Sequence, residues 1–444
     1  MGLDRERYGT PEWNPLGDVI KPGSSVVIKP NFVTDRVPEE SGEAITTHGS
    51  VIRAVVDFAC IALQGQGSIT ICDGPYMNTD FVRLVKASGV DKIAEYYEKY
   101  SSIKVKVVDI RKEKRILRKI GGVRLEPFPG DPSDYKVVDL GKDSDLFEII
   151  GDCEKFRVSY YDKNEMLKHH NWERNEYLIS GTVLNADVVI NIPKLKTHAR
   201  TGITCAMKNM VGITGIKDWL PHYRSGPAER GGDEYIYSDW RKDLFIKLKD
   251  AQTATGNILF IVIARFLSAL LFFSKYIMPF KDDYIGGSWY GNDTLPRTIS
   301  DLNKILYFAD RNGVMRDTPQ RRVFVVVDGI IGGEGDGPMN NSARKCGVLI
   351  AGHNPVSVDL VCAALMGFNP QKIPTLKYAL NCGRYKYFAA SAEDIDLSPS
   401  NCMDLQDIYT LYNCSFMPPD GWKGFIEYGD FALGIGSKST ECLY

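Results

Sequence analysis

Apolar and polar positions follow two patterns along this chain, one typical of buried strands and one typical of helices. Continuous apolar runs at residues 25–31, 68–72, 187–192 and 322–328 predict strands that are buried on both faces. Between the first two runs, residues 50–64 carry apolar side chains at helical spacing. Alternation of this kind predicts an α/β fold with a mainly parallel sheet, right-handed crossovers and helices on both faces.

The pattern is interrupted once, which divides the chain into two α/β halves. Residues 20–235 form the predicted N-terminal half, residues 236–300 a helical insert, and residues 301–444 the C-terminal half. In the last of these, a glycine-rich loop precedes a second strand at 348–352, and a helix follows from 355 to 367. A length of 444 residues fits two or three such units.

The insert has a distinct character, because residues 257–280 are almost continuously apolar. Only Arg265, Ser268, Ser274 and Lys275 interrupt this stretch. At 100° per residue, Arg265, Ser268 and Lys275 share one side of a helix and leave a broad apolar surface. The sequence leaves two interpretations open, a helix that docks on a membrane interface or a protein partner and a helix of the core. Crossing a bilayer is least favoured, since a central arginine costs about 2.5–3.5 kcal/mol.

Composition and charge exclude several classes of protein. The 54 basic and 56 acidic residues nearly balance, so no overall charge favours nucleic acid as a partner. The first residues lack the basic and apolar regions of a secretion signal, which predicts a cytoplasmic protein whose membrane association depends on residues 257–280. No two of the ten cysteines have the two-residue spacing of a cluster-binding motif, so we expect reduced thiols and no iron-sulfur cluster.

Cationic side chains collect directly after the strand at 187–192. Lys194, Lys196 and His198 follow it closely, and Lys208 comes ten residues after His198. Because ligands of parallel sheets gather at the carboxyl ends of the strands, this placement predicts a site for an anion or a metal. A solvated basic loop is the alternative interpretation of so short a run.

Carboxylates collect in the C-terminal half. Asp328 ends a predicted strand, and Glu334 and Asp336 lie in the glycine-rich loop that follows. Glycines permit tight turns, so these carboxylates can converge on a hard cation such as Mg²⁺, with His198 as a further metal ligand. The alternative is an acidic turn capped by its own backbone.

Several ordered motifs resemble the domain-of-unknown-function family 362 over roughly residues 20–390, apart from the apolar insert. Some members of that family carry an added cluster domain, and this chain lacks the paired cysteines for it. The motifs are Lys29-Pro30-Asn31, Thr47-His48-Gly49, Ile71-Cys72-Asp73-Gly74-Pro75, Pro193-Lys194-Leu195-Lys196-Thr197-His198, Lys208-Asn209 and Ala351-Gly352-His353-Asn354-Pro355-Val356-Ser357-Val358-Asp359.

A more distant resemblance is to the catalytic domain of the lactate racemase family, which holds a nickel-pincer nucleotide. His198, Gly202 and Lys208 keep the spacing of that family, in which a lysine ten residues after the histidine carries the cofactor. The chain departs from the family at Asp73-Gly74-Pro75, which stands where the racemase has a Gly-Thr-His turn, so a histidine important for proton transfer is missing. From this resemblance we expect a cofactor to be held by Lys194, Lys208, Asn209 and Gly202.

Two hypotheses of function follow. The first is an enzyme that acts on a small anionic substrate by metal- or cofactor-assisted proton or hydride transfer, with Mg²⁺ or Ni²⁺ as the metal. Its catalytic residues are His198, Lys208, Lys196 and His48: the lysines bind negative charge and stabilise an oxyanion, and His198 is a general base near its free pKa. The second is a noncatalytic anion-binding protein that docks on a membrane or a complex through residues 257–280.

Overall fold

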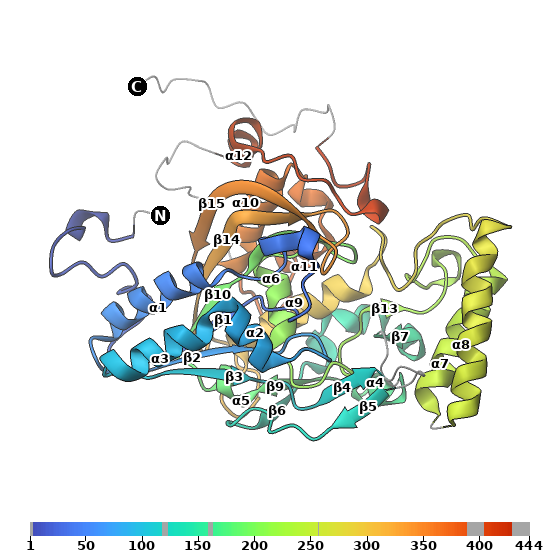
Figure 1. Ribbon diagram of the computed structural model, residues 1–444, viewed down its shortest axis with the longest axis horizontal. Helices are drawn as coiled ribbons and strands as arrows, with labels where there is room; N and C mark the ends of the chain where they lie inside the picture. Colours follow the sequence, from blue (N-terminus) through green and yellow to red (C-terminus); the bar gives the residue numbers. More distant parts are fainter. Residues whose placement is uncertain (1–2, 118–122, 159–162, 256, 389–403, 429–444) are drawn as a thin grey trace.

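A mainly parallel sheet of eight strands forms the centre of the molecule, which confirms the predicted fold class (Figure 1). The computed structural model describes residues 3–117, 123–158, 163–255, 257–388 and 404–428. The strands of this sheet are β1 (Ser25–Pro30), β2 (Ser68–Asp73), β3 (Val105–Asp109), β10 (Val188–Ile192), β11 (Lys194–His198), β12 (Gly202–Ile203), β14 (Arg322–Glu334) and β15 (Ser342–Gly352).

Both predicted halves contribute strands to this one sheet. Its order is β12-β11-β14-β10-β1-β2-β3, and β15 pairs with β14. Strands β3, β2, β1, β10 and β14 run parallel to their neighbours, whereas β15 runs antiparallel to β14 and β12 antiparallel to β11. The long β14 pairs first with β10 and then with β11, so its far end lies beside Lys194 and Lys196.

The chain between the strands forms helices and three small sheets. The helices are α1 (Gly49–Leu63), α2 (Phe81–Ser88), α3 (Val90–Tyr100), α4 (Lys163–His169), α5 (Gly181–Leu184), α6 (Ala206–Asn209), α7 (Trp240–Ala254), α8 (Ile258–Phe273), α9 (Thr294–Phe308), α10 (Pro355–Met366), α11 (Pro374–Leu380) and α12 (Leu405–Tyr412). The small sheets pair β4 (Lys114–Leu117) with β5 (Val123–Glu126), β7 (Phe156–Arg157) with β13 (Tyr223–Arg224), and β9 (Arg174–Ser180) with β6 (Tyr135–Asp139) and β8 (His170–Asn171).

Apolar side chains cover both faces of the central sheet, as the continuous apolar runs predict. On one face, Val26 and Ile28 of β1 join a buried cluster with α1 and α3. On the other face, Val27 joins a larger cluster that includes residues of α6, α9, α10 and α11. Successive side chains of a strand point to opposite faces, so a strand covered on both sides must be apolar throughout.

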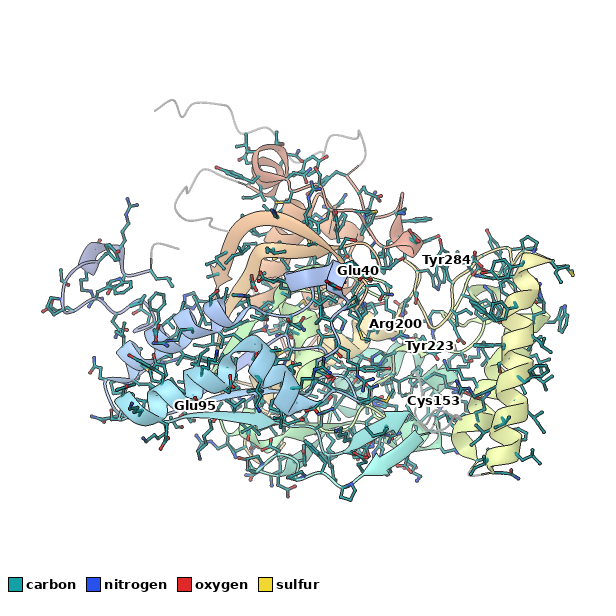
Figure 2. All side chains as sticks on the ribbon, viewed as in Figure 1. Glu40, Glu95, Cys153, Arg200, Tyr223 and Tyr284 are labelled. Atoms are coloured by element: carbon teal, nitrogen blue, oxygen red, sulfur yellow. The ribbon has the colours of Figure 1, made fainter. Side chains whose placement is uncertain are left out.

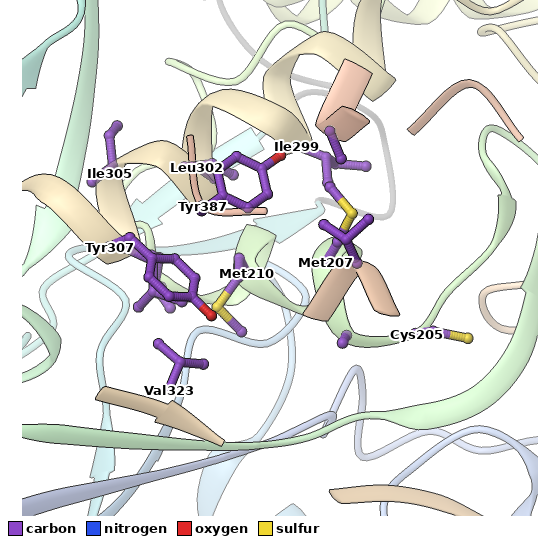
Figure 3. Close-up of a cluster of buried hydrophobic side chains, with 14 of the residues drawn as sticks. Cys205, Met207, Met210, Ile299, Leu302, Ile305, Tyr307, Val323 and Tyr387 are labelled. Atoms are coloured by element: carbon purple, nitrogen blue, oxygen red, sulfur yellow. The ribbon is translucent and has the colours of Figure 1, made fainter. Parts of the chain in front are cut away.

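Helix α9 lies inside the second cluster, and every one of its residues is buried. Figure 3 shows Ile299 and Leu302 of α9 near Met207 and Met210, which lie on and just after α6. The side-chain amide of Asn303 donates to the carbonyl of Met207 at 3.1 Å. Because α9 spans residues 294–308, the predicted end of the insert at residue 300 falls inside a core helix.

The part of the insert that stands apart is a pair of packed helices, α7 and α8, at one edge of the molecule (Figure 1). Most large apolar side chains of α8 are exposed, among them Leu259 and Phe266 at 70% and 65%. The structure therefore does not fit the interpretation of α8 as a core helix. By length and hydropathy alone, two helical stretches are able to cross a membrane, Glu39–Leu63 and Ile258–Tyr276, with 44% and 11% of their apolar windows buried.

Candidate functional site: a lysine cluster at the carboxyl ends of the central strands

The central strands end in polar side chains that contact one another. Lys29 near the end of β1 pairs in register with Asn191 of β10. The Nζ atom of Lys29 lies 2.7 Å from a carboxylate oxygen of Asp73, the last residue of β2. Asp73 also accepts a hydrogen bond of 2.9 Å from the backbone N–H of Phe32. All of these groups meet because the carboxyl ends of neighbouring parallel strands lie at the same edge of a sheet.

The side-chain amide of Asn209 joins α6 to this edge. Its oxygen accepts from Asn31 at 3.0 Å and from Lys29 Nζ at 3.3 Å. Its nitrogen donates to the side-chain oxygen of Asn191 at 2.7 Å and to the carbonyl of Lys29 at 3.2 Å. With both ends of the amide in use, Asn209 fixes α6 against β1 and β10. We predicted a cofactor-binding role for this residue, and its contacts in the structure are with the protein.

The lysines that the sequence placed in a loop lie in strand β11. All five residues of this strand are buried, and Lys194 and Asp328 are register partners across β11 and β14. The interpretation as a solvated basic loop is therefore wrong. Lys194 Nζ lies 2.9 Å from the carboxylate of Asp328, which also accepts from the backbone N–H of His48 at 2.9 Å. Lys196 Nζ donates to two backbone carbonyls, those of Ile45 at 2.8 Å and Pro338 at 3.1 Å.

His198 ends this strand and is buried, with 4% of its surface exposed. Its Nδ1 accepts a hydrogen bond of 3.0 Å from the backbone N–H of Arg200, so the proton of the neutral ring is on Nε2. Burial lowers the pKa of His198 well below its usual range, and the charges of Lys208 and Arg200 add to the shift. The surroundings therefore do not keep this imidazole near its free pKa, and its predicted role as a general base stays a prediction. The ring presents a neutral N–H donor.

Gly202 supports the turn that follows. Its φ of +74° is in the left-handed region, and a Cβ there would lie 3.2 Å from ring carbons of Trp422. The indole N–H of Trp422 in turn donates to the carbonyl of Ala199 at 2.7 Å. Gly202 is thus needed for close packing between this turn and the C-terminal segment.

Lys208 differs from the other lysines of the cluster. It is half-buried on α6, and its Nζ makes no hydrogen bond or ion pair with any residue that the structure describes. Burial, together with the nearby charges of Arg200 and Lys29, lowers the pKa of Lys208 to about 8. An ammonium group in this position has an unused hydrogen-bonding capacity and an unbalanced charge.

Lys217 is a further cation that contacts no carboxylate among the described residues, and sequence reasoning missed it. Its Nζ donates to the carbonyl of Val211 at 2.7 Å and to the hydroxyl of Thr214 at 3.1 Å. Burial lowers the pKa of Lys217 to about 7. The side chain also lines a small pocket, together with Pro75 and Arg111. No local motif marks Lys217, because its neighbours in the cluster come from distant strands.

Arg200 and His222 complete the cluster. Arg200 donates through Nε to the carbonyl of Gly286 at 2.6 Å, and its guanidinium carbon lies 5.9 Å from the ring centroid of Tyr223 (Figure 2). His222 Nδ1 lies 2.7 Å from the carbonyl of Leu220 and must donate to it. Burial lowers the pKa of His222 to about 3, so its ring is neutral and its Nε2 carries a lone pair.

The electrostatic balance of this cluster is positive. Its two carboxylates, Asp73 and Asp328, are each in contact with one lysine, Lys29 and Lys194. The charge of Lys208 contributes to the lowered pKa values of Lys196, Lys217, His198 and His222. Each of these groups therefore titrates under the influence of Lys208, and an anion near its Nζ would relieve repulsion across the whole set.

His48 lies away from these side chains. It is exposed, and its Nδ1 caps the N-terminus of α1 by accepting from the backbone N–H of Ser50 at 3.2 Å. Its Nε2 lies 3.4 Å from a carboxylate oxygen of Glu43. Only its backbone N–H reaches the cluster, through Asp328. Its predicted catalytic role stays a prediction.

The predicted metal ligands contact different parts of the protein. Glu334 accepts from the backbone N–H of Met417 and Asp336 from that of Asp420, both at 2.9 Å, so these two carboxylates hold the C-terminal segment. Among the described residues, the ligand atoms of Asp328, Glu334, Asp336 and His198 do not gather into a group that could hold a metal ion. A metal at these residues stays a prediction.

The ligand-type atoms that do come together are those of Cys205, Asp359 and Cys362, which lie within 4.8 Å of one another and are buried. Both carboxylate oxygens of Asp359 are occupied by the N-terminus of α6, accepting from Ala206 at 2.6 Å and Met207 at 3.0 Å. Burial raises the pKa of Asp359 to about 7. Asp359 therefore positions the helix that carries Lys208.

Comparisons with known proteins give a family and one curated relative. A family model described as "Domain of unknown function (DUF362)" matches residues 26–126 and 115–364. A thylakoid-associated protein of Synechocystis sp. is 23% identical over 363 residues, which are 81% of this chain and 68% of that protein. No solved structure matches the chain. The resemblance to the lactate racemase family is not shown by these matches.

Proposed function

The chain belongs to the DUF362 family, and from this premise we propose that its lysine cluster binds a small anion and that Lys208 transfers a proton next to the bound charge. The observation that carries the proposal is the Nζ of Lys208, which has no partner among the described residues and lies in a cluster whose carboxylates already contact other lysines. Desolvated cations are costly to hold together without a counter-ion, so a cluster of this kind is typical of a binding site.

The pKa of Lys208 fits a group that exchanges protons. A value of about 8 leaves both the charged and the neutral form populated near neutral pH, which is where general acid–base catalysis is most effective. A carboxylate or phosphate of the substrate would be held by the charges of Lys217 and Arg200. Neutral Lys208 would then accept the proton from the adjacent carbon, and the electron pair of the C–H bond would pass to the substrate oxygen.

The two histidines offer complementary groups for that oxygen and its proton. His198 presents an N–H donor at Nε2, because its Nδ1 accepts from Arg200. His222 presents an acceptor at Nε2, because its Nδ1 donates to Leu220. A neutral donor beside lysines stabilises an enolate-like oxyanion without itself losing a proton. Reprotonation of the same carbon by Lys208 would complete an isomerisation with no net oxidation.

A proton-exchange assay in D₂O tests this proposal. Purified protein is first analysed by intact mass and elemental analysis, which reveals any bound ligand, Mg²⁺ or Ni²⁺. Proton NMR then follows the α-hydrogens of 2-hydroxy acids, sugar acids and phosphorylated hydroxy acids. We expect one class to exchange with the wild-type protein.

Two substitutions of one residue separate binding from proton transfer. Lys208→Arg keeps the positive charge but cannot release its proton, so binding should survive and exchange should be lost. Lys208→Met should weaken both. Exchange at the wild-type rate in Lys208→Arg would refute the role of Lys208 in proton transfer.

A noncatalytic protein that only holds the anion is the second candidate, and the exposed apolar surface of α8 favours it. The relative from Synechocystis sp. is named for its association with thylakoids, which supports a membrane location for this chain as well. Tight binding of an anion without α-hydrogen exchange in any substrate class would favour this candidate over the enzyme.

A further inference from the structure

The face that α8 turns toward the protein is narrow. Its buried residues are Ile261, Ala264 and Ser268, and the amide of Gln252 on α7 lies 3.4 Å from the hydroxyl of Ser268. In an ordinary surface helix the apolar stripe would be the side turned inward. Here Ile261 is the one bulky apolar residue among the three buried residues of α8, and most of the other bulky apolar side chains point outward.

The exposed surface of α8 is apolar from end to end except at Arg265, which is also exposed. Isolated exposed apolar side chains are normal on proteins, but a continuous patch of this extent marks a binding surface. The exposed large side chains are Ile258, Leu259, Phe260, Val262, Ile263, Phe266, Leu267, Leu270, Phe272 and Phe273, followed by Tyr276, Ile277 and Met278.

Ion pairs fix the helix pair to the body, so α8 is presented as one edge of the molecule (Figure 1). Asp250 near the end of α7 contacts Arg157 at 3.1 Å, and Asp243 contacts Arg230 at 2.7 Å. The chain that leaves α8 returns to the start of α7, where Lys242 Nζ lies 2.6 Å from Asp282. The whole protein can therefore contact a flat surface through α8.

The charge of this region complements an anionic surface. Residues 257–281 contain three basic and no acidic residues. The acidic residues of the helix pair and its flanks are in ion pairs, Asp243 and Asp250 with the body, and Asp239, Asp282 and Asp283 with Arg241, Lys242 and Lys275. The basic side chains of Lys247, Arg265 and Lys281 are exposed. Exposed aromatic side chains lie where α7 begins and α8 ends: Trp240 is 67% exposed and Tyr276 is 75% exposed. Aromatic and basic side chains together are typical of proteins that sit at the level of lipid head groups.

We propose that the outward face of α8 inserts into the interface of a lipid bilayer with anionic head groups, with the helix lying along the surface. The proposal concerns a surface of its own and does not depend on whether the lysine cluster is catalytic. Burial of the apolar side chains in the acyl boundary supplies the affinity, and the basic residues add attraction to anionic lipids.

The connectivity argues against a crossing orientation. The start of α7 and the end of α8 lie together, since Arg241 donates to the carbonyl of Met278 at 2.6 Å. If α8 crossed the bilayer, α7 would have to cross beside it. Helix α7 has fifteen residues, and six of them are charged, which is prohibitive for a spanning segment. A helix that lies in the interface leaves α7 and its ion pairs in water.

Vesicle cosedimentation tests the proposal with the full chain. The probes are vesicles of phosphatidylcholine alone and vesicles of equal parts phosphatidylcholine and phosphatidylglycerol. The variant is the triple substitution Leu259→Ser, Phe266→Ser and Leu270→Ser, all at exposed positions where the fold should tolerate a polar side chain. The matched control replaces three exposed apolar residues elsewhere, Val82→Ser, Tyr100→Ser and Leu411→Ser.

We expect the wild type and the control to bind the anionic vesicles more strongly than the neutral ones. The triple variant should bind at least about a hundredfold more weakly, because each apolar side chain withheld from the bilayer weakens partitioning by about tenfold. Wild-type protein that ignores both vesicles would overturn the proposal. A triple variant that binds the vesicles as well as the control does would also overturn it. So would a wild-type protein that does not bind the vesicles and instead forms a dimer that the triple variant cannot form.

Discussion

Replacing Lys208 with methionine isolates one charge of the lysine cluster, because the side chain keeps its approximate size and loses only its ammonium group. At 4 Å and an effective dielectric constant of 20, a lysine and a unit anion attract by about 4 kcal/mol. Desolvation of both partners offsets part of this at a half-buried position. We expect a net loss of about 2 kcal/mol, which is about thirtyfold in affinity.

The pH dependence of binding gives the experiment its specificity. Sulfate is a suitable probe because it keeps its charge throughout the neutral range, so only groups of the protein titrate. Charged Lys208 binds the anion, and its pKa is about 8. The advantage of the wild type over Lys208→Met should be full below pH 8 and should shrink above it. Lys217, whose pKa is about 7, should add an earlier decline in the wild type, and this decline should move to higher pH in Lys208→Met, because the charge of Lys208 no longer lowers the pKa of Lys217.

Isothermal titration calorimetry between pH 6.5 and 9.5 measures these affinities. Repeating the titration near pH 8 in two buffers of different ionisation enthalpy reveals proton uptake, because a bound anion raises the pKa of Lys208. This uptake should be smaller in Lys208→Met. The control is Lys92→Met, which removes an exposed lysine of α3 and should leave affinity unchanged. Equal affinities of the wild type and Lys208→Met at pH 7, or a difference that does not change with pH, would refute the reasoning.

Stability should move in the opposite direction to binding. A lysine whose pKa is lower in the folded than in the unfolded state binds fewer protons when folded, so it destabilises the protein below its folded pKa. Lys208→Met should therefore unfold at a higher urea concentration than the wild type at pH 7. This combination of weaker binding and greater stability is typical of a functional residue rather than a structural one.

Three further substitutions test the support of the site, each by urea unfolding. Asp359→Ala should lose about 2–4 kcal/mol, because two buried backbone N–H groups of α6 lose their acceptor. Burial raises the pKa of Asp359 to about 7, so the folded protein holds the proton of this carboxyl more tightly than the unfolded chain does. The difference in stability between the wild type and Asp359→Ala should therefore shrink as the pH rises from about 4 to 7. A difference that does not change with pH would contradict this. Lys194→Met should cost about 3–5 kcal/mol because it leaves the Asp328 carboxylate buried without its cation, and adding Asp328→Leu should recover part of the loss; no recovery would mean that the pair itself is not the cause. Gly202→Ala should cost about 1–2 kcal/mol for its positive φ alone, with more from contact with Trp422, and a neutral result would show that the turn can relax.

The central sheet was predictable because its signal is local. A parallel strand that is covered on both faces is apolar nearly throughout, and the run before Asp328, Val323-Phe324-Val325-Val326-Val327, meets that requirement in the sequence itself. The carboxyl ends of those strands are also where polar residues were expected to meet. Lys29 and Asp73 lie in contact there, as neighbouring parallel strands require.

The assignment of Lys194–His198 to a loop failed for a physical reason. Charged residues rarely lie in buried strands, so a local pattern with two lysines and a histidine indicates a surface loop. The strand exists because β14 continues past the end of β10 and supplies hydrogen-bonding partners, together with the Asp328 carboxylate that neutralises Lys194. These partners are more than a hundred residues away in the sequence.

The sequence by itself determined which residues form the parallel strands, that a long apolar helix interrupts the halves, and that cations gather near a strand end. These properties depend on the chemistry of neighbouring positions. Only the tertiary structure decided which lysine of the described chain lacks a partner and which face of α8 is turned outward. Both outcomes depend on segments that come together only in the fold. Asp73 and Asp328 contact Lys29 and Lys194 and leave Lys208 without a partner among the described residues, and Gln252 of α7 contacts Ser268 of α8. Pairing between distant groups is a property of three-dimensional packing, which no local pattern records.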